Sequence, residues 1–311
     1  MSIKERIQGL AATLRLPNVP SVWSNTLTGV IFATLIQGQG ENTATPLVLL
    51  AILSATCLYF SGNLFNDWAD LEWDRKHRPE RALPSGAFLP SQYLALGILM
   101  TLLGLTFAAF TSLTAMLVSA TLAFFIILYT WGHKRTAWGV VPMALCRASL
   151  PILGFCACAN NWQQSHWIFL SSAILFSYLT MLSLRARTES HPSSSASMSL
   201  LTGAGFLLPL LLVIGTPHAP ITYTGGIIAI SLSSLPYVVW TLMALTIFRK
   251  PIAGQISALL AGIPLLDALF LMPYLLLGHV ITDHSMPYWL IVAWGPAFVA
   301  GRLLQRFIPA T

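Results

Sequence analysis

Residues 62–86 read GNLFNDWADLEWDRKHRPERALPSG, and this stretch holds five of the ten acidic residues of the 311-residue chain. Charge is scarce elsewhere, because only 8% of the residues are charged while 56% are hydrophobic and the mean hydropathy is +0.73. A soluble domain has about a quarter of its residues charged. The composition therefore excludes an ordinary soluble domain and makes the position of each charged cluster informative.

Apolar runs of about 17 to 25 residues, the length that crosses a bilayer as a helix, recur from one end of the sequence to the other. They predict an all-α fold, a polytopic transmembrane helical bundle of about nine to ten spans that forms a single domain over residues 1–311. We place the candidate spans at residues 21–36, 46–65, 93–110, 112–131, 139–158, 167–184, 200–214, 225–247, 256–277 and 287–304.

The basic residues predict the orientation of these spans. In a ten-span arrangement, fifteen of the sixteen Lys and Arg residues fall on one side, and the remaining one, Arg147, lies inside a span. Cytoplasmic loops collect Lys and Arg, so both termini are expected in the cytoplasm of a multi-pass integral membrane protein, for which we expect the bacterial inner membrane. The basic residues behind the net charge of +6 thus set the orientation of the spans among membrane lipids. No nucleic-acid partner is expected.

Five side chains of the opening stretch share one helical face. At 100° per residue they fall within an arc of about 100°, whereas Glu72 points away. Carboxylates crowded at the edge of hydrocarbon repel one another, and a divalent cation relieves that repulsion. Oxygen ligands favour Mg²⁺, which prefers one or two carboxylates together with phosphate oxygens. The five residues are Asn63, Asn66, Asp67, Asp70 and Asp74.

Basic residues follow directly, and Arg75, Arg78 and Arg81 are expected to neutralise further phosphate oxygens. The pattern therefore favours a diphosphate held through Mg²⁺. A simpler interpretation is a solvated loop whose acidic and basic side chains form surface ion pairs, each contributing about 0 to 1 kcal/mol. The shared face argues against this interpretation, because a merely polar loop has no reason to keep it.

The motif NDWADLEWD, followed by RPERALPSG, resembles the first aspartate-rich motif of the UbiA superfamily of intramembrane prenyltransferases. The stretch LRLPNVPSVWSNTLTG resembles the first helix of that family, with Asn25 facing its cavity, and YTWGHKRT resembles the Tyr and Lys-Arg segment after the fourth helix. VVPMALCRASLPILG, with Arg147, is similar to the fifth helix of the EboC-like branch.

The resemblance implies a lipid-accessible cavity under a cytoplasmic polar cap. Proteins of this family bind a prenyl diphosphate through Mg²⁺, ionise its allylic C–O bond and let a hydrophobic or aromatic acceptor capture the carbocation. By resemblance, the catalytic residues are Asn66, Asp67, Asp70 and Asp74, and the metal ligands are Asn63, Asp67, Asp70 and Asp74. The expected diphosphate-binding residues are Asn63, Arg75, Arg78, Arg81, Lys134, Arg135, Arg147, Arg185 and Arg187.

The cavity or the acceptor is expected to contact Asn25, Glu189 and Asp267. Arg147 and Asp267 lie within predicted spans, where a charged side chain costs about 2.5 to 3.5 kcal/mol and normally faces the interior with a partner. For Arg147 a structural pairing competes with diphosphate binding. For Asp267 a hydrogen bond to a neighbouring helix and a role in orienting the acceptor are both open.

The sequence departs from the family at the second aspartate-rich motif. The corresponding place reads MLSLRARTESHP, which contains Arg185, Arg187 and Glu189 but no aspartate. Fixed guanidinium charge could replace one metal ion, and the protein would then be a UbiA-type prenyltransferase. Alternatively, the chain is a noncatalytic prenyl-diphosphate binder or lipid carrier. An ion-coupled transporter is disfavoured, because the sequence shows no inverted repeat of interrupted helices.

Overall fold

The computed structural model describes residues 3–37, 45–132, 137–159, 166–190, 203–215, 224–276 and 293–308. Every regular element in these ranges is helical, as predicted. In chain order the α-helices and two short 3₁₀ turns are α1 (Ile3–Thr13), η1 (Leu16–Asn18), α2 (Val19–Gln37), α3 (Thr45–Ala69), α4 (Leu71–His77), α5 (Pro90–Ala109), α6 (Leu113–Gly132), η2 (Ala137–Gly139), α7 (Val140–Cys158), α8 (His166–Ser190), α10 (Leu208–Gly215), α11 (Thr224–Thr246), α12 (Ile252–Ala261), α13 (Ile263–Leu276) and α15 (Trp294–Leu304).

Six segments of the described chain are long and apolar enough to cross a membrane. They are Thr45–Ala69, Pro90–Ala109, Leu113–Gly132, Val140–Cys158, Ile168–Ala186 and Ile252–Met272. Shorter apolar helical segments cover Gly203–Val213 and Ile230–Thr246. The protein is therefore an integral membrane protein, and the total of nine to ten spans stays a prediction.

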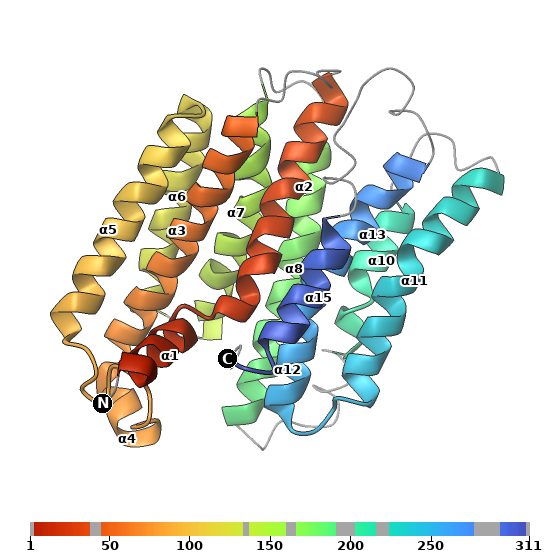
Figure 1. Ribbon diagram of the computed structural model, residues 1–311. Helices are drawn as coiled ribbons and strands as arrows, with labels where there is room; N and C mark the ends of the chain where they lie inside the picture. The colour runs from red at the N-terminus through yellow and green to blue at the C-terminus, as the bar shows by residue number, and fades with distance from the viewer. Residues whose placement is uncertain are drawn as a thin grey trace.

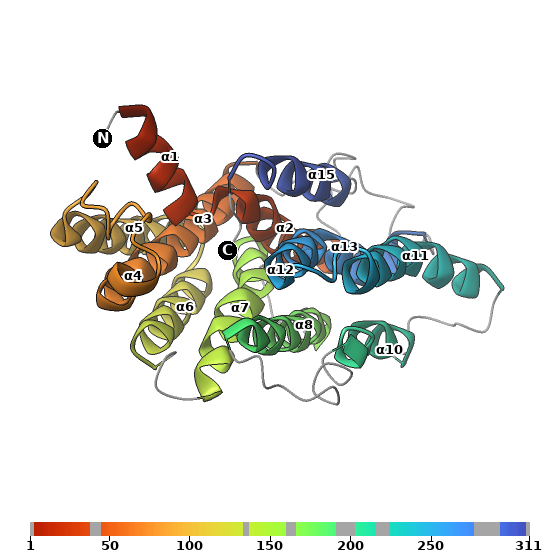
Figure 2. The same cartoon turned by 90° about the horizontal axis from the view of Figure 1, so that it is seen from below.

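The long helices lie side by side, while α1 and α4 lie together at one end of the bundle (Figure 1). Helix α3 packs against α5 and α6, and α7 packs against α2, α6 and α8. Helix α13 contacts α2, α11 and α15, so α2 touches both the early and the late helices. Figure 2 shows this order from the end that carries α1 and α4.

Several helix bounds differ from the predicted spans by a few residues, and two of the differences bear on the site. Helix α3 continues to Ala69, four residues beyond the predicted end at residue 65, and Asn66 and Asp67 in this extension are buried. The predicted span 256–277 consists of two helices, α12 and α13, that meet at Gly262. A uniform apolar pattern does not reveal such a break, since both helices are equally hydrophobic.

Helices α2 and α7 make close backbone contact. A Cβ atom at Gly29 would collide with the carbonyl oxygen of Pro151, and one at Gly154 would collide with the carbonyl oxygen of Thr26. Small residues let transmembrane backbones approach in this way. Pro151 also lacks the N–H that would bond the carbonyl of Arg147 one turn earlier. This contact fixes the position of the helices that carry Asn25 and Arg147.

The outer faces of the bundle are apolar. Large hydrophobic side chains are exposed along α5, α6 and α11, a pattern that suits contact with lipid tails and not with water. Examples are Leu99, Leu102, Leu117, Phe124, Ile127, Leu235 and Leu242.

Candidate functional site

The aspartate motif lies where α3 passes into α4. The backbone N–H of Asp70 donates to the carbonyl of Asn66 at 2.9 Å, and that of Asp74 donates to the carbonyl of Asp70 at 2.8 Å. Both bonds join residues four positions apart, so the helical hydrogen-bond pattern continues from α3 into α4. The shared face that the sequence suggests is therefore kept from α3 into α4.

The five polar side chains of this face are buried, and we call them the aspartate stripe. Their exposed fractions lie between 1% and 9%. The side chain of Glu72, which lies between them in sequence, is 81% exposed. Buried carboxylates need partners, so the stripe is not a set of solvated loop residues. The stripe consists of Asn63, Asn66, Asp67, Asp70 and Asp74.

Arg81 is a basic partner of the stripe. Its Nη1 donates to Oδ2 of Asp74 at 2.9 Å and lies 3.5 Å from Oδ1 of Asp67. The side chain of Arg81 is 23% exposed, so part of the guanidinium remains accessible. A guanidinium placed between two carboxylates can also bond phosphate oxygens that approach the same surface.

Arg75 and Arg78 are exposed, and their printed contacts are with residues outside the stripe. Nη1 of Arg75 lies 2.7 Å from Oε1 of the exposed Glu72, and the Arg78 guanidinium lies 5.9 Å from the Trp73 ring centroid. Arg75 lies three residues after Glu72, which places both on the exposed face of α4, and Arg78 follows the end of that helix. The phosphate contacts of Arg75 and Arg78 stay predictions.

The chain between α1 and α2 packs directly on the stripe. The hydroxyls of Thr13 and Tyr93 are hydrogen-bonded at 2.9 Å, and Thr13 lies beside the carboxylate of Asp67. Nδ2 of Asn63 donates to the carbonyl of Leu14 at 3.2 Å. The end of α1 thus belongs to the wall of the site, which the sequence motif alone does not suggest.

Arg15 is a residue of this wall that sequence reasoning missed. Its backbone has φ 48° and ψ 51°, and among the described residues it is the one non-glycine with positive φ. The hydroxyl of Tyr59 donates to its carbonyl at 3.2 Å, which helps to hold this unusual conformation. Strained backbone of this kind clusters at functional sites. The available signal was its place as the one basic residue immediately before the first apolar run.

The charge of Arg15 balances the stripe. Burial by itself would lower the pKa of Arg15, but Asp67, together with Tyr59, Tyr129 and Asp70, raises that pKa above its ordinary value. The guanidinium therefore stays positively charged beside the carboxylates. Together with Arg81, it offsets part of the repulsion within the stripe.

Deeper in the bundle, α2, α7 and α13 share a buried hydrogen-bonded cluster that we call the polar bridge. Arg147 donates from Nη2 to Oγ of Ser21 at 2.7 Å and from Nη1 to Oδ1 of Asn25 at 3.3 Å. Nδ2 of Asn25 lies 2.8 and 3.1 Å from the carboxylate oxygens of Asp267, and Ser24 also donates to that carboxylate. Arg147 and Asp267 thus have the interior partners that their depth requires.

The polar bridge lies against the same helix as the stripe. The guanidinium of Arg147 lies 5.5 Å from the ring centroid of Tyr59. Tyr59 precedes Asn63 by four residues, so both lie on one face of α3, about 6 Å apart along the axis. Arg147 therefore extends the face of the stripe by one helical turn into the membrane.

The other predicted clamp residues are only partly described. Nε of Arg185, in α8, donates to Oε1 of Gln255 in α12 at 2.9 Å. This bond ties Arg185 to a neighbouring helix, and its predicted contact with the diphosphate stays a prediction. The side chains of Arg187 and Glu189, and the whole of Lys134 and Arg135, lie outside the described residues.

The donor set of the stripe fits a metal that is shared with a ligand. Oδ1 of Asn66 is buried without a hydrogen-bond partner. In the part of the chain that the structure describes, no three acidic, histidine or cysteine side chains are gathered closely enough to hold a metal by themselves. Mg²⁺ commonly takes one or two carboxylates and completes its shell with water and phosphate oxygens. The stripe therefore suits Mg²⁺ with a diphosphate, not a cage built only by protein.

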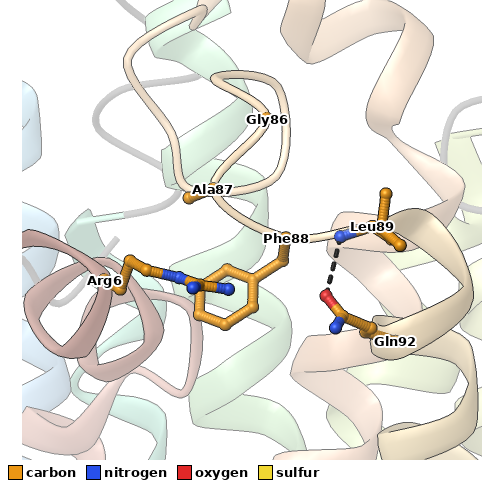
Figure 3. A pocket seen from close by; sticks show the side chains of 6 residues that line it. All are labelled: Arg6, Gly86, Ala87, Phe88, Leu89 and Gln92. Atoms are coloured by element: carbon orange, nitrogen blue, oxygen red, sulfur yellow. Dashed lines mark hydrogen bonds between the residues drawn. The ribbon is translucent and has the colours of Figure 1, made fainter. Parts of the chain in front are cut away.

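A separate pocket of about 390 Å³ opens between α1 and the start of α5 (Figure 3). The Arg6 guanidinium lies 5.1 Å from the centroid of the Phe88 ring, and the N–H of Leu89 donates to Oε1 of Gln92 at 2.9 Å. None of the predicted site residues lines this pocket. It is therefore distinct from the predicted substrate cavity.

Two curated relatives match part of the chain. A protoheme IX farnesyltransferase of Solibacter usitatus is 34% identical over 133 residues, which is 41% of this chain and 45% of the relative. A digeranylgeranylglyceryl phosphate synthase of Pyrococcus horikoshii is 30% identical over 128 residues, which is 40% of this chain and 45% of the relative. The chain thus spans less than half the length of either relative in these matches.

Solved structures share the fold at low sequence identity. A UbiA homolog from Aeropyrum pernix K1 has a TM-score of 0.64 at 15% identity and covers 81% of this chain and 96% of its own. A UbiA homolog from Archaeoglobus fulgidus, bound to GPP and Mg²⁺, has a TM-score of 0.52 at 14% identity and covers 96% of this chain and 97% of its own. At such identities the likeness establishes the fold.

A family match covers most of the sequence. The model described as the UbiA prenyltransferase family matches residues 26–260, a range that includes the stripe, Arg81 and Arg147 but excludes Arg15, Asn25 and Asp267. The EboC-like branch stays a prediction, since these matches name no branch. On the match over residues 26–260 and the shared fold, the chain belongs to the UbiA prenyltransferase family.

Proposed function

We propose that the protein transfers an isoprenyl group from an allylic prenyl diphosphate to a hydrophobic or aromatic acceptor within the membrane, with Mg²⁺ as cofactor. The observation that carries this proposal is the burial of five oxygen-bearing side chains on one face at the end of α3 and in α4, beside Arg81 and Arg15. Such a surface offers ligands for a cation and, beside them, cations for phosphate oxygens.

The residues of the site would divide the work as follows. Asn63, Asn66, Asp67, Asp70 and Asp74 would hold Mg²⁺ and orient the diphosphate. When bound, the metal supplies positive charge where the departing diphosphate gains negative charge. Arg81 and Arg147 would contact diphosphate oxygens and stabilise the same charge, because it grows as the allylic C–O bond breaks. Asn25, Glu189 and Asp267 stay candidates for lining the cavity or contacting the acceptor.

The acceptor is proposed by chemistry and not by name. The two relatives reported above are named for a farnesyl transfer to protoheme and for a digeranylgeranylglyceryl phosphate, so the family likeness supports prenyl transfer without selecting one acceptor. A cavity in the apolar bundle would admit a hydrophobic or aromatic molecule from the bilayer. We also propose a location in the bacterial inner membrane with both termini in the cytoplasm.

The test uses the full chain purified in detergent and a panel of allylic diphosphates of increasing chain length. Binding and diphosphate release are each measured with and without Mg²⁺, in the presence of aromatic and lipid acceptors. We expect Mg²⁺-dependent binding and release, and Asp70→Ala should abolish both. Glu72→Ala is the matched control, because the exposed Glu72 should leave both unchanged. Equal effects of the two variants would contradict the proposed site.

A second candidate function is a noncatalytic prenyl-diphosphate binder or lipid carrier. It is favoured by the missing second aspartate motif and by the bond of Arg185 to Gln255, which leaves that predicted clamp residue tied to α12. A carrier needs the stripe to grip the head group but does not need leaving-group activation. Mg²⁺-dependent binding with no diphosphate release, whichever acceptor is present, would favour the carrier.

A further inference from the structure

Asp267 and Arg147 are opposite charges that are bridged by an amide. The Asn25 side chain donates from Nδ2 to Asp267 and accepts at Oδ1 from Arg147. The orientation of the Asn25 amide is therefore fixed from both ends, since a flipped amide would turn its donor toward the guanidinium and its acceptor toward the carboxylate. The carboxylate is further held by Ser24, and the guanidinium by Ser21.

We infer that Asp267 is a positioning residue, which acts through Asn25 to fix the direction in which Arg147 presents its guanidinium to the diphosphate. This inference rests on the proposed function, because it assigns a second layer of residues to the same site. It also assigns a role to the late helix α13, which carries none of the aspartate stripe.

The bonding pattern supports positioning over a simple ion pair. The bonds to Ser21 and Asn25 use two of the five N–H groups of the Arg147 guanidinium. Asp267 takes its hydrogen bonds from Asn25 and Ser24, and so does not occupy the fork of the guanidinium. An arginine held at one edge keeps its other donors for a ligand.

The location supports the same role. Arg147 lies over the Tyr59 ring, one helical turn deeper than Asn63 on the face of the stripe. A diphosphate held at the stripe would therefore have this guanidinium on the side that faces the membrane interior. Arg147 and Asp267 are both buried, with exposed fractions of 9% and 3%, so neither orients freely in solvent.

The test measures the affinity of the full chain in detergent for inorganic pyrophosphate at saturating Mg²⁺, and the KM for geranyl diphosphate. The variants are Asp267→Asn, which keeps the shape but frees the amide of Asn25, and Ser21→Ala, which removes the second contact of Arg147. Ser54→Ala is the control, since Ser54 is equally buried but donates to Gly104 on the side of α3 that faces α5.

We expect Asp267→Asn to weaken pyrophosphate binding and raise KM by about tenfold, and Ser21→Ala to do so by a few fold, both measured on folded protein below its melting temperature. In an Arg147→Met background both substitutions should have no further effect, because they act through Arg147. A merely structural role would instead give additive losses. If Asp267→Asn does not fold, Ser21→Ala and its double variant decide the question.

Unchanged affinity in Asp267→Asn would overturn the inference while leaving the proposed function intact. Tighter pyrophosphate binding would also overturn it, because Asp267 would then act only by competing for the charge of Arg147. If the unmodified protein binds neither pyrophosphate nor geranyl diphosphate with Mg²⁺, the proposed function itself fails.

Discussion

Two arginines six positions apart have opposite surroundings. Arg81 bonds Asp74 and approaches Asp67, whereas Arg75 bonds the exposed Glu72. Both carry the same charge, so they separate the effect of a positive charge near the site from the effect of a contact with the stripe. A surface ion pair such as that of Arg75 contributes little in water.

Arg81→Gln is expected to weaken Mg²⁺-dependent diphosphate binding by about tenfold or more, because it removes a charged hydrogen-bond donor and leaves Asp74 buried without it. Arg75→Gln is expected to leave binding within about twofold of the unmodified protein. Titration calorimetry with geranyl diphosphate and Mg²⁺ checks both. A comparable loss in the two variants would mean that only the general basic charge of the segment matters.

Arg15→Gly separates backbone strain from charge. Glycine adopts positive φ without the cost of about 1 to 2 kcal/mol that a side chain incurs, so the local fold should persist. Loss of the guanidinium beside Asp67 and Asp70 should increase the affinity of the stripe for Mg²⁺ alone, by about tenfold, since a competing cation is gone. Mg²⁺ titration followed by intrinsic fluorescence measures this. Unchanged Mg²⁺ affinity would show that Arg15 does not balance the stripe.

At the scale of elements, the contact of α2 with α7 determines whether the polar bridge can form. Gly29 and Gly154 allow the two backbones to touch, and Asn25 and Arg147 lie close by along the same helices. Any side chain at these glycines must push the helices apart, because the atoms that it meets belong to the facing backbone and cannot move aside alone.

Gly154→Ala is expected to destabilise the protein by about 3 kcal/mol and to reduce diphosphate binding in parallel. Gly295→Ala in α15 is the matched control: nothing lies within 4 Å of the added Cβ, so its stability should be unchanged or slightly higher. Thermal unfolding in detergent measures both variants. A stable Gly154→Ala protein would contradict the close contact described here.

Some features of the helices could be predicted from the sequence, and others could not. The periodic polar face from Asn63 to Asp74 could be predicted, because helical spacing alone decides which residues share a face. The break at Gly262 and the exposed position of Arg78 could not, since they depend on how the helices pack and turn. Arg15 was missed because its role follows from a backbone conformation, which composition and charge do not encode.

At the scale of the whole molecule, the two ends of the described chain lie at the same end of the bundle. Helix α1 begins and α15 ends on the side of the bundle where α4 and the stripe lie (Figure 1). The helical architecture could be predicted from apolar length alone. The number of crossings could not, because α10, α12, α13 and α15 are short and a short apolar helix does not by itself establish a crossing.

A reporter fused after Thr311 tests the orientation. Because basic residues lie at the end of the bundle that carries the stripe, we expect cytoplasmic reporter activity, as for a second reporter placed before α1. A fusion within the apolar α6 serves as a control for an interrupted chain. A periplasmic signal at the carboxyl end together with a cytoplasmic signal at the amino end would establish an odd number of crossings.

The polar bridge has a consequence for how the polypeptide could be divided. Suppose that the chain is divided directly after α8, which ends at Ser190. Ser21, Asn25 and Arg147 then belong to the first fragment, and Asp267 belongs to the second. Two fragments that are synthesised separately and inserted into the same bilayer would therefore each carry part of the polar bridge. Lipid tails offer no hydrogen-bonding groups to replace the missing part. Co-expression of such fragments should restore a working assembly, and Asp267→Leu in the second fragment should prevent their pairing.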